Sequence, residues 1–214
     1  MGDRFYATVR TLAWPLLRGW LRLHVRGLNH VPPTGGLLVV ANHSSYLDPA
    51  VLGRACPRKL HFVIKRSVHE VRGLRWFFRG MDAIPVEAGT RDTGALRAAL
   101  RLLDRGQAVG IFPEGGRSGD GTLRAAQTGV GLLASRSGAV VVPAGIRGAH
   151  RAMPVGALVP RPVRVEVHFG PALTFPAIDG VRPDLELVTG RIMDEVQRLS
   201  AAPPAWSGAS EAVS

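Results

Sequence analysis

The sequence has one cysteine, few aromatic residues and no long uncharged apolar run near its start, and each shortage excludes a class of protein. Cys56 cannot form an internal disulfide and has no neighbouring cysteine or histidine at the spacing of a zinc site, which fits a reducing cytoplasm. Aromatic residues make up 6% and are not interleaved with basic residues as in nucleic-acid-binding modules. In the N-terminal segment the longest uncharged stretch, 11–17, is far shorter than the roughly 20 residues that span a bilayer. We therefore expect no disulfide scaffold, no zinc module and no N-terminal membrane span.

Acidic residues are also few. The chain carries 27 Lys and Arg against 16 Asp and Glu, which gives a formal net charge of +11. This balance predicts an anionic neighbour, which can be nucleic acid, anionic lipid or a phosphorylated substrate. Arginine greatly outnumbers lysine, and alanine, glycine and proline abound, a composition that GC-rich codons also produce. Charge alone does not choose among these explanations.

The first 26 residues show an amphipathic pattern. Apolar side chains recur at helical spacing while arginines lie on the other side, which is typical of a helix on a membrane surface. Pro15 should divide the segment into two helices, because a proline inside a helix removes a hydrogen bond and clashes with the preceding turn. An ordinary helix packed on the core is the alternative. The apolar positions are Phe5, Val9, Leu12, Leu16, Trp20 and Leu23, and the basic ones are Arg4, Arg18, Arg22 and Arg26.

Short apolar runs alternate with helical stretches along the rest of the chain. Continuously apolar runs are typical of strands buried on both faces, and alternation of strands with helices indicates a sheet covered by helices. We predict one α/β domain over 27–200 with a mostly parallel central sheet, after a membrane-associating segment at 1–26 and before a disordered tail at 201–214. The expected strands are 37–41, 61–64, 83–86, 108–112, 139–142 and an edge or half-exposed strand at 163–169, and the clearest helices are 93–103, 129–135 and 184–199.

A histidine and an aspartate follow the first of these strands. In α/β sheets functional residues gather in loops at the carboxyl ends of strands, which is where His43 stands. The carboxylate of Asp48 could accept a hydrogen bond from one imidazole nitrogen and leave the other as a general base. The structural alternative is that Asp48 caps the helix that Pro49 begins and that His43 is an ordinary loop residue.

A glycine-rich block at 112–118 follows another apolar run. Gly115 and Gly116 let backbone amides approach a ligand closely. Arg117 offers a forked donor that suits phosphate, and Ser118 adds a hydroxyl. The block predicts an anion-binding loop, with a plain surface turn as the alternative.

Taken together, Asn42-His43 with Asp48, the block 112–118 and the run 141–146 resemble the motifs of the glycerolipid acyltransferase family, typified by 1-acylglycerol-3-phosphate acyltransferase. The likeness covers roughly 27–175, and the motifs match in order and separation. It implies that His43 deprotonates the acceptor hydroxyl while Asp48 orients the ring. The alkoxide then attacks the thioester of acyl-CoA or an acylated carrier protein as co-substrate, and no metal or bound cofactor is implied.

The resemblance also implies which residues bind substrate. The block around Glu114 corresponds to the family's acceptor-phosphate site, with Glu114 shaping the loop, and the run 141–146 corresponds to one that lines the acyl-donor side. The substrate-binding residues expected on this basis are Asn42, Lys65, Arg91, Glu114, Gly115, Gly116, Arg117 and Ser118.

Three departures from the family pattern concern the phosphate site. Glu87 stands where an arginine is usual, Gly116 replaces a threonine, and an expected lysine is missing from 123–129. Other basic residues could substitute, or the acceptor could carry a different head group, such as a lyso-aminolipid or another lysophospholipid. The basic candidates are Lys65, Arg66, Arg91 and Arg124.

The expected activity is acyl transfer to 1-acylglycerol-3-phosphate, giving phosphatidic acid, by a peripheral protein on the cytoplasmic face of the cell membrane. Its expected partners are an anionic membrane surface, the lysophospholipid and acyl-CoA or acyl carrier protein, without nucleic acid. A non-catalytic binder of anionic lipid or nucleic acid is the alternative class. A hydrolase that uses His43 with water is a third possibility.

Overall fold

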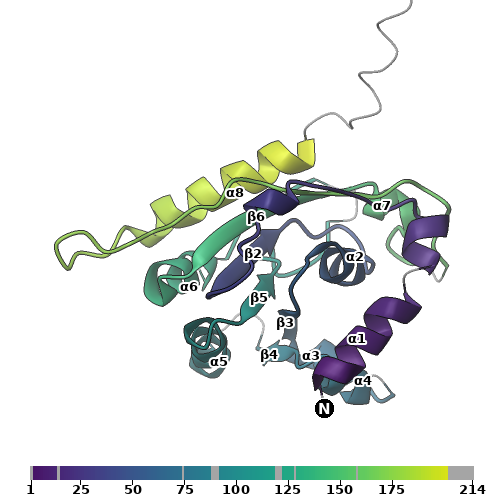
Figure 1. Ribbon diagram of the computed structural model, residues 1–214, viewed down its shortest axis with the longest axis horizontal. Coiled ribbons are helices and arrows are strands. Elements are labelled where there is room, and N and C mark those ends of the chain that lie inside the picture. The colour runs from purple at the N-terminus through teal and green to yellow at the C-terminus, as the bar shows by residue number, and fades with distance from the viewer. Residues whose placement is uncertain are drawn as a thin grey trace, which may run out of the picture.

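The fold is built on a seven-stranded sheet (Figure 1). The computed structural model describes residues 2–13, 15–73, 75–87, 92–118, 122–127, 129–157 and 159–201. Neighbouring strands are parallel except β6 and β7, which are antiparallel. The mostly parallel central sheet is therefore confirmed. In the sheet order β1-β7-β6-β2-β5-β3-β4, the bounds are β1 His24–Arg26, β7 Glu166–Phe169, β6 Val140–Arg147, β2 Leu37–Ala41, β5 Ala108–Ile111, β3 Leu60–Lys65 and β4 Ile84–Val86.

Helices cover both faces of this sheet, as Figure 1 shows. Alternate residues of the fully buried strand β2 point to opposite faces: Val39 belongs to a core shared with α2, and Val40 to a core shared with α5, α6 and α8. This explains the continuously apolar run at 37–41, since a strand covered on both sides has no polar face. The helices are α1 Gly2–Leu12, α2 Asp48–Ala55, α3 Arg66–His69, α4 Arg75–Gly80, α5 Thr93–Asp104, α6 Gly129–Ser137, α7 Ala149–Ala152 and α8 Leu185–Ala201, with a π-helical turn at Leu16–Trp20 and a 3-10 turn at Leu28–His30.

The expected edge strand at 163–169 is the main error in the predicted sheet. Strand β7 is shorter and pairs on both sides, because the unpredicted strand β1 lies outside it. Glu166 is fully buried in β7, between Arg147, whose Nη2 lies 2.6 Å from one carboxylate oxygen, and Arg26, whose Nε lies 3.1 Å from the other. The charged residue that suggested exposure is therefore paired inside the protein, where a lone carboxylate would be costly.

The N-terminal segment is divided at Pro15 as expected, since α1 ends at Leu12 and the π-helical turn follows the proline. The buried side chains differ from the predicted stripe. Leu17 and Leu21 are fully buried, while Leu12 and Trp20 are 75% and 47% exposed. A π-helical turn holds more residues than an α-helical one, so it rotates the following side chains away from the expected face.

The C-terminal helix α8 lies along β6 (Figure 1). The approach is close at Gly145, where an added Cβ would stand 2.4 Å from the backbone carbon of Leu199. Helix α8 runs to Ala201, the first residue of the expected tail, and 202–214 lie outside the described residues. No helix in the described part of the chain is long and apolar enough to cross a membrane.

Candidate active site

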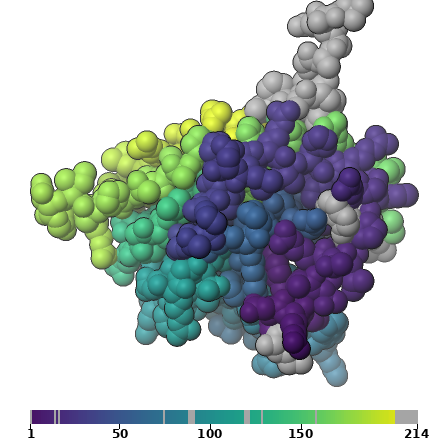
Figure 2. Space-filling view, viewed as in Figure 1, coloured from purple at the N-terminus to yellow at the C-terminus, as the bar shows by residue number. Residues whose placement is uncertain are grey.

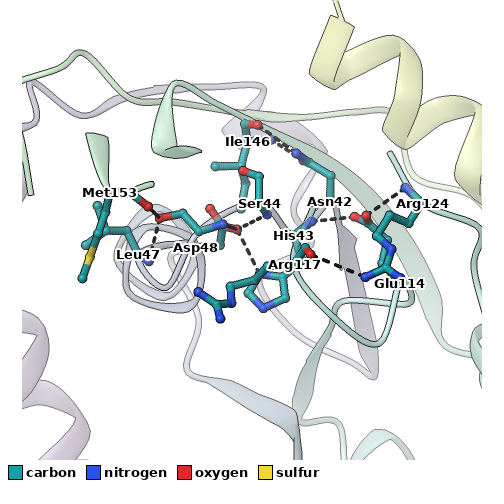
Figure 3. A network of polar contacts seen from close by, with 11 residues as sticks. Asn42, His43, Ser44, Leu47, Asp48, Glu114, Arg117, Arg124, Ile146 and Met153 are labelled. Atoms are coloured by element: carbon teal, nitrogen blue, oxygen red, sulfur yellow. Dashed lines mark hydrogen bonds and ion pairs between the residues drawn. The ribbon is translucent and has the colours of Figure 1, made fainter. Parts of the chain in front are cut away.

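Two loops that leave neighbouring parallel strands meet at the carboxyl edge of the sheet. The first follows β2 and carries His43, and the second follows β5 and carries Glu114. The peptide N–H of His43 donates to Glu114 Oε1 at 2.6 Å (Figure 3). The N–H of Ser118 donates to the His43 carbonyl at 3.0 Å. The two sequence motifs therefore form one site, as parallel neighbouring strands require.

His43 and Asp48 form a direct hydrogen bond in this site. Imidazole Nδ1 lies 2.9 Å from Asp48 Oδ2, and the carboxylate is fully buried. An ionised carboxylate only accepts hydrogen bonds, so the proton of this bond belongs to Nδ1. Nε2 is then left with a free lone pair on the opposite side of the ring. With 19% of its side chain exposed, His43 can act as a general base toward a substrate hydroxyl.

The suggestion that Asp48 caps helix α2 is not what the structure shows. Leu47 occupies the cap position, without a side-chain cap hydrogen bond, and Asp48 begins the helix. Its Oδ2 accepts the backbone N–H groups of Ser44 at 2.6 Å and Ser45 at 2.7 Å in addition to the His43 ring. The carboxylate thus folds the turn 44–47 back on itself and fixes His43 beside it. Its role is to hold the base rather than to satisfy the helix terminus.

Aromatic rings stack against one face of the imidazole. The ring of Phe112 stacks on His43 with centroids 4.5 Å apart, and Phe62 stacks on Phe112 at 5.9 Å. Phe112 directly follows β5, so the strand that carries the anion-binding block also supports the base. The Asp48 hydrogen bond and this stacking together restrict the ring to one orientation, which an efficient general base needs.

Glu114 clamps the two loops together. Its second oxygen accepts the backbone N–H of Arg124 at 2.9 Å, so the buried carboxylate joins 43, 114 and 124. Burial raises the pKa of Glu114 above its ordinary value, while the hydrogen bonds from the backbone of Arg124 and His43 oppose that shift. Glu114 was expected to shape the loop, and these contacts agree with that function.

We expect Glu114→Gln to lower the free energy of unfolding by about 1–3 kcal/mol, because the amide nitrogen would face one of two buried N–H donors. The mispositioned His43 loop should also lower catalytic activity. Urea denaturation with a parallel activity assay measures both effects. Glu195→Gln, which alters a partly exposed carboxylate of a surface ion pair with Arg198 on α8, is the control and should change both little. Equal behaviour of the two variants would contradict the clamp.

Gly115 has a conformational reason to be glycine. Its φ is +63°, a left-handed conformation that residues with a Cβ disfavour. An added Cβ would stand 2.3 Å from the side-chain nitrogen Nε2 of Gln127. The N–H of Gln127 also donates to the Pro113 carbonyl at 2.9 Å. The segment after the block therefore folds back over it and brings Arg124 to the site.

Two cationic side chains border Gly116, while Arg117 of the same loop extends to the other side of the His43 ring (Figure 3). The Arg117 guanidinium stacks on the Tyr46 ring, 3.3 Å from its centroid, and its buried Nη1 has no hydrogen-bond partner. A Cβ placed on Gly116 would lie 3.4 Å from Arg124 Nη1 and 3.8 Å from Lys65 Nζ. Glycine at 116 thus leaves open space between these two cations. Such a group of cations suits a phosphate.

Of the other basic candidates, Arg66 does not join this group. Arg66 forms an ion pair with Glu87, the residue that stands where an arginine was expected, and lies 3.8 Å from Glu70. Arg91 lies outside the described residues. Of the three candidates in the described part of the chain, Lys65 and Arg124 are therefore those that the fold places beside Gly116.

Asn42 and the run 141–146 have contacts other than those expected. The Asn42 side chain donates to the Ile146 carbonyl at 3.0 Å and accepts the Ile146 N–H at 2.7 Å, so it joins the end of β2 to β6. The whole run 141–146 is buried inside the sheet. We therefore interpret Asn42 as a residue that positions the His43 loop, and the run as its support rather than as a donor-binding surface.

Two contributors to the site were not singled out from the sequence. Tyr46 stacks on Arg117 and Phe112 stacks on His43, and both pairs join loops from different strands. The signals that could have suggested their parts are positional: Tyr46 lies between His43 and Asp48, and Phe112 begins the block 112–118. No cluster of three or more His, Cys, Asp or Glu side chains that could hold a metal occurs among the described residues.

Comparisons with known proteins give the family. The acyltransferase family model matches residues 22–147, more than half of the chain and all of the loops described above. The chloroplastic 1-acyl-sn-glycerol-3-phosphate acyltransferase of Arabidopsis thaliana is 29% identical over 138 residues, which cover 63% of this chain and 38% of that protein. The 1-acyl-sn-glycerol-3-phosphate acyltransferase of Bacillus subtilis is 26% identical over 133 residues, covering 62% and 65%. The chain thus spans less than two thirds of the length of these relatives.

A solved structure agrees in fold. The 1-acyl-sn-glycerophosphate acyltransferase PlsC from Thermotoga maritima matches with a TM-score of 0.76 and 24% identity, over 93% of this chain and 81% of that one. At this identity the likeness speaks for the fold alone. With the family model spanning the His43 and Glu114 loops, the conclusion is that this chain belongs to the acyltransferase family.

Proposed function

We propose that this chain transfers a fatty acyl group from a thioester to the free hydroxyl of 1-acylglycerol-3-phosphate. The observation that carries the proposal is the His43–Asp48 hydrogen bond of 2.9 Å next to a loop whose Arg117 has a buried, unpaired guanidinium nitrogen. The His43–Asp48 pair supplies a base for a hydroxyl, and the Arg117 loop supplies an anion site beside it. Relatives of this chain are named 1-acyl-sn-glycerol-3-phosphate acyltransferases, and the acyltransferase family model spans both loops.

The reaction needs one proton transfer at His43. Nε2 takes the proton of the acceptor hydroxyl as its oxygen attacks the thioester carbonyl, and Asp48 stabilises the imidazolium that forms. The tetrahedral intermediate then collapses, the carbon–sulfur bond breaks, and the proton passes to the departing thiolate. The products are the ester and a free thiol. The donor is acyl-CoA or acylated carrier protein, and His43 with Asp48 suffices for this step without a bound cofactor.

Arg117, Arg124 and Lys65 are the proposed phosphate ligands of the acceptor. The stack on Tyr46 fixes the plane of the Arg117 guanidinium, and the Glu114 clamp on the Arg124 backbone fixes where that side chain begins. Both arginines flank His43, so a phosphate bound by either side chain would bring the glycerol hydroxyl toward the base (Figure 3). Because charge-assisted hydrogen bonds are directional, this arrangement positions the substrate as well as binding it.

We expect Arg117→Ala to raise the KM for 1-acylglycerol-3-phosphate about 10- to 100-fold, because a charge-assisted hydrogen bond contributes about 1.5–3 kcal/mol. Arg117→Lys should fall between wild type and alanine, since lysine keeps the charge but loses the planar fork and the stacking. Steady-state kinetics with both substrates varied measures the effect. The KM for the donor should not change, and Arg101→Ala on the exposed face of α5 is the control. An unchanged acceptor KM in Arg117→Ala would contradict the assignment.

The identity of the acceptor is tested by product analysis. Purified protein is offered one labelled acyl donor and a panel of lysolipids that differ only in head group. Labelled phosphatidic acid as the dominant product supports the proposal. Labelled free fatty acid without any acceptor would indicate a hydrolase, and no product with any acceptor would indicate a non-catalytic binder.

One observation favours a different lysophospholipid as the second candidate acceptor. Glu87 and Arg66 neutralise each other at the position where the family has an arginine, so the phosphate site carries fewer unpaired cations than that pattern provides. A zwitterionic head group needs less positive charge. A dominant product other than phosphatidic acid in the same panel would select this candidate.

We also propose that the enzyme works on a membrane surface, as its lipid substrates require. The support is a set of exposed apolar side chains with arginines near them in the N-terminal segment and in α4. Leu12, Trp20 and Trp76 are exposed, and Arg18, Arg75 and Arg79 accompany them. Such surfaces bind anionic bilayers through both apolar burial and charge.

A further inference from the structure

A loop that follows α7 presents apolar side chains to solvent. We call residues 153–161 the valine loop, of which residue 158 lies outside the described part. Val155 is 55% and Val159 is 72% exposed. The loop is nevertheless held in shape, because the Ala157 N–H donates to the Pro154 carbonyl at 3.0 Å and the Arg161 N–H donates back to Ala152 of α7 at 2.7 Å. Exposed valines on a closed loop are a fixed apolar surface.

The valine loop lies against the N-terminal segment, a contact that the sequence does not predict. The indole N–H of Trp20 donates to the Pro160 carbonyl at 2.8 Å, across 140 positions of the chain. Just beyond the loop, the Val165 N–H donates to the Leu21 carbonyl at 2.9 Å. Figure 1 shows α7 and the segment after it beside the N-terminal helical turn, and Figure 2 shows the two regions adjoining on the surface. Trp20 and the valines therefore form one apolar surface.

This surface is tied to the catalytic turn. The Ser45 hydroxyl donates to the carbonyl of Met153, the first residue of the valine loop, at 3.0 Å (Figure 3). Ser45 stands between His43 and Asp48, and its backbone N–H binds the Asp48 carboxylate. Whatever binds the valine loop is thereby held at a fixed place relative to the proposed base.

The two chain segments that form this surface carry charges of one sign only. Neither 4–47 nor 121–165 contains an aspartate or a glutamate, and arginines flank both apolar parts. A protein partner with an ordinary mixed surface would leave these cations unmatched, whereas anionic lipid head groups match them while the apolar side chains enter the acyl boundary. An indole with a polar contact at one end also suits the interface. The exposed arginines are Arg18, Arg22, Arg151 and Arg161.

We infer that the valine loop and Trp20 together form a surface that docks on an anionic lipid bilayer and holds the His43 turn at the level of the head groups. The second half of this inference rests on the proposed function, while the docking itself does not. The valine loop lies outside the N-terminal amphipathic pattern to which Trp20 belongs, and only the fold brings the loop beside that residue.

A fluorescent label placed on the valine loop tests the docking directly. Val159→Cys carries an environment-sensitive dye, and the native Cys56 is fully buried with the pKa of its thiol raised by burial, so it should not react in the folded protein. Val181→Cys is the matched control, because Val181 is 71% exposed on a hairpin that Figure 1 places at the opposite end of the sheet from α7. The vesicles are phosphatidylcholine with or without phosphatidylglycerol.

The expected result is a blue shift and an intensity gain for the label at 159, with phosphatidylglycerol vesicles only, and no change for the label at 181. Failure of the protein to bind these vesicles would overturn the inference. So would binding with the label at 159 still in a water-like environment, or with both labels shifted equally. None of these outcomes depends on acyl transfer.

A double substitution then separates docking from catalysis. Val155→Asp with Val159→Asp should weaken vesicle partitioning at least about tenfold, because two apolar side chains are replaced by charges that anionic lipid repels. Ile178→Asp with Val181→Asp is the control pair. The first variant should lose activity on vesicle-borne acceptor yet keep it on a dispersed short-chain acceptor. Unchanged partitioning would refute docking, whereas inactivity of the wild type on both acceptors would refute the proposed function alone.

Discussion

Replacing His43 by alanine is expected to lower kcat for acyl transfer by at least about 100-fold, because a general base contributes roughly 10²–10⁴ to a rate. The KM values should change little, since the ring contacts Asp48 and Phe112 rather than the proposed phosphate ligands. Steady-state kinetics on the purified protein measures this. Added imidazole should restore part of the rate by occupying the space that the side chain leaves.

The control for this experiment is His24→Ala, which changes an exposed histidine on the edge strand β1. It should match wild type in rate and in melting temperature. His43→Ala should also keep its melting temperature nearly unchanged, which shows that the lost rate is chemical. A wild-type rate in His43→Ala would overturn the proposed mechanism and leave the site as an anion-binding loop.

The second large effect is expected from Asp48→Asn, which keeps the volume but changes the hydrogen bonding. If the amide nitrogen takes the place of Oδ2, it gives up the bonds from the Ser44 and Ser45 N–H groups and donates to Nδ1, which moves the ring proton to Nε2 and removes the lone pair that the reaction needs. If the amide oxygen stays there, the negative charge that stabilises the imidazolium is lost. A rate loss of about a thousandfold or more is the expectation, since the equivalent change in catalytic triads removes about 10⁴. The measurement is kcat, with circular dichroism to verify the fold.

A structural explanation of that loss is separable from the catalytic one. Asp184→Asn changes another carboxylate that accepts two backbone N–H groups, those of Glu186 and Leu187 at the start of α8. Asp184→Asn should lower the free energy of unfolding by roughly 0.5–2 kcal/mol at most, with no loss of kcat. If Asp48→Asn lost only stability and kept its rate, the carboxylate would be structural and the tautomer argument would fail.

Much of the sheet could be predicted because buried strands carry their own pattern. The run 37–41 is β2, and the runs at 108–112 and 139–142 lie within one residue of where β5 and β6 begin. The three-residue strand β1 was missed, since three residues show no alternation that could distinguish them from a loop. That omission also caused the error on β7, because an edge position depends on which strand lies beside it and not on its own residues.

The candidate site was predicted only in part for a similar reason. His43, Asp48, Glu114 and Arg117 follow strands in recognisable blocks, and the fold brings them together. The pairing of Arg66 with Glu87 could not be read from the chain, because it depends on strands β3 and β4 lying side by side. Without that contact, Arg66 and Lys65 are equivalent candidates for the phosphate.

By itself the sequence determined the chemistry available to this protein: a histidine with a carboxylate five residues later, a glycine-rich block with an arginine, and apolar runs that require a covered sheet. The tertiary structure decided how these groups are used. It turned Asp48 toward His43 instead of the helix terminus, placed Lys65 and Arg124 around Gly116, and set the valine loop against Trp20. The physical reason is that strand patterns and motifs arise from neighbouring residues, whereas each of these arrangements depends on contacts that form only when distant segments pack.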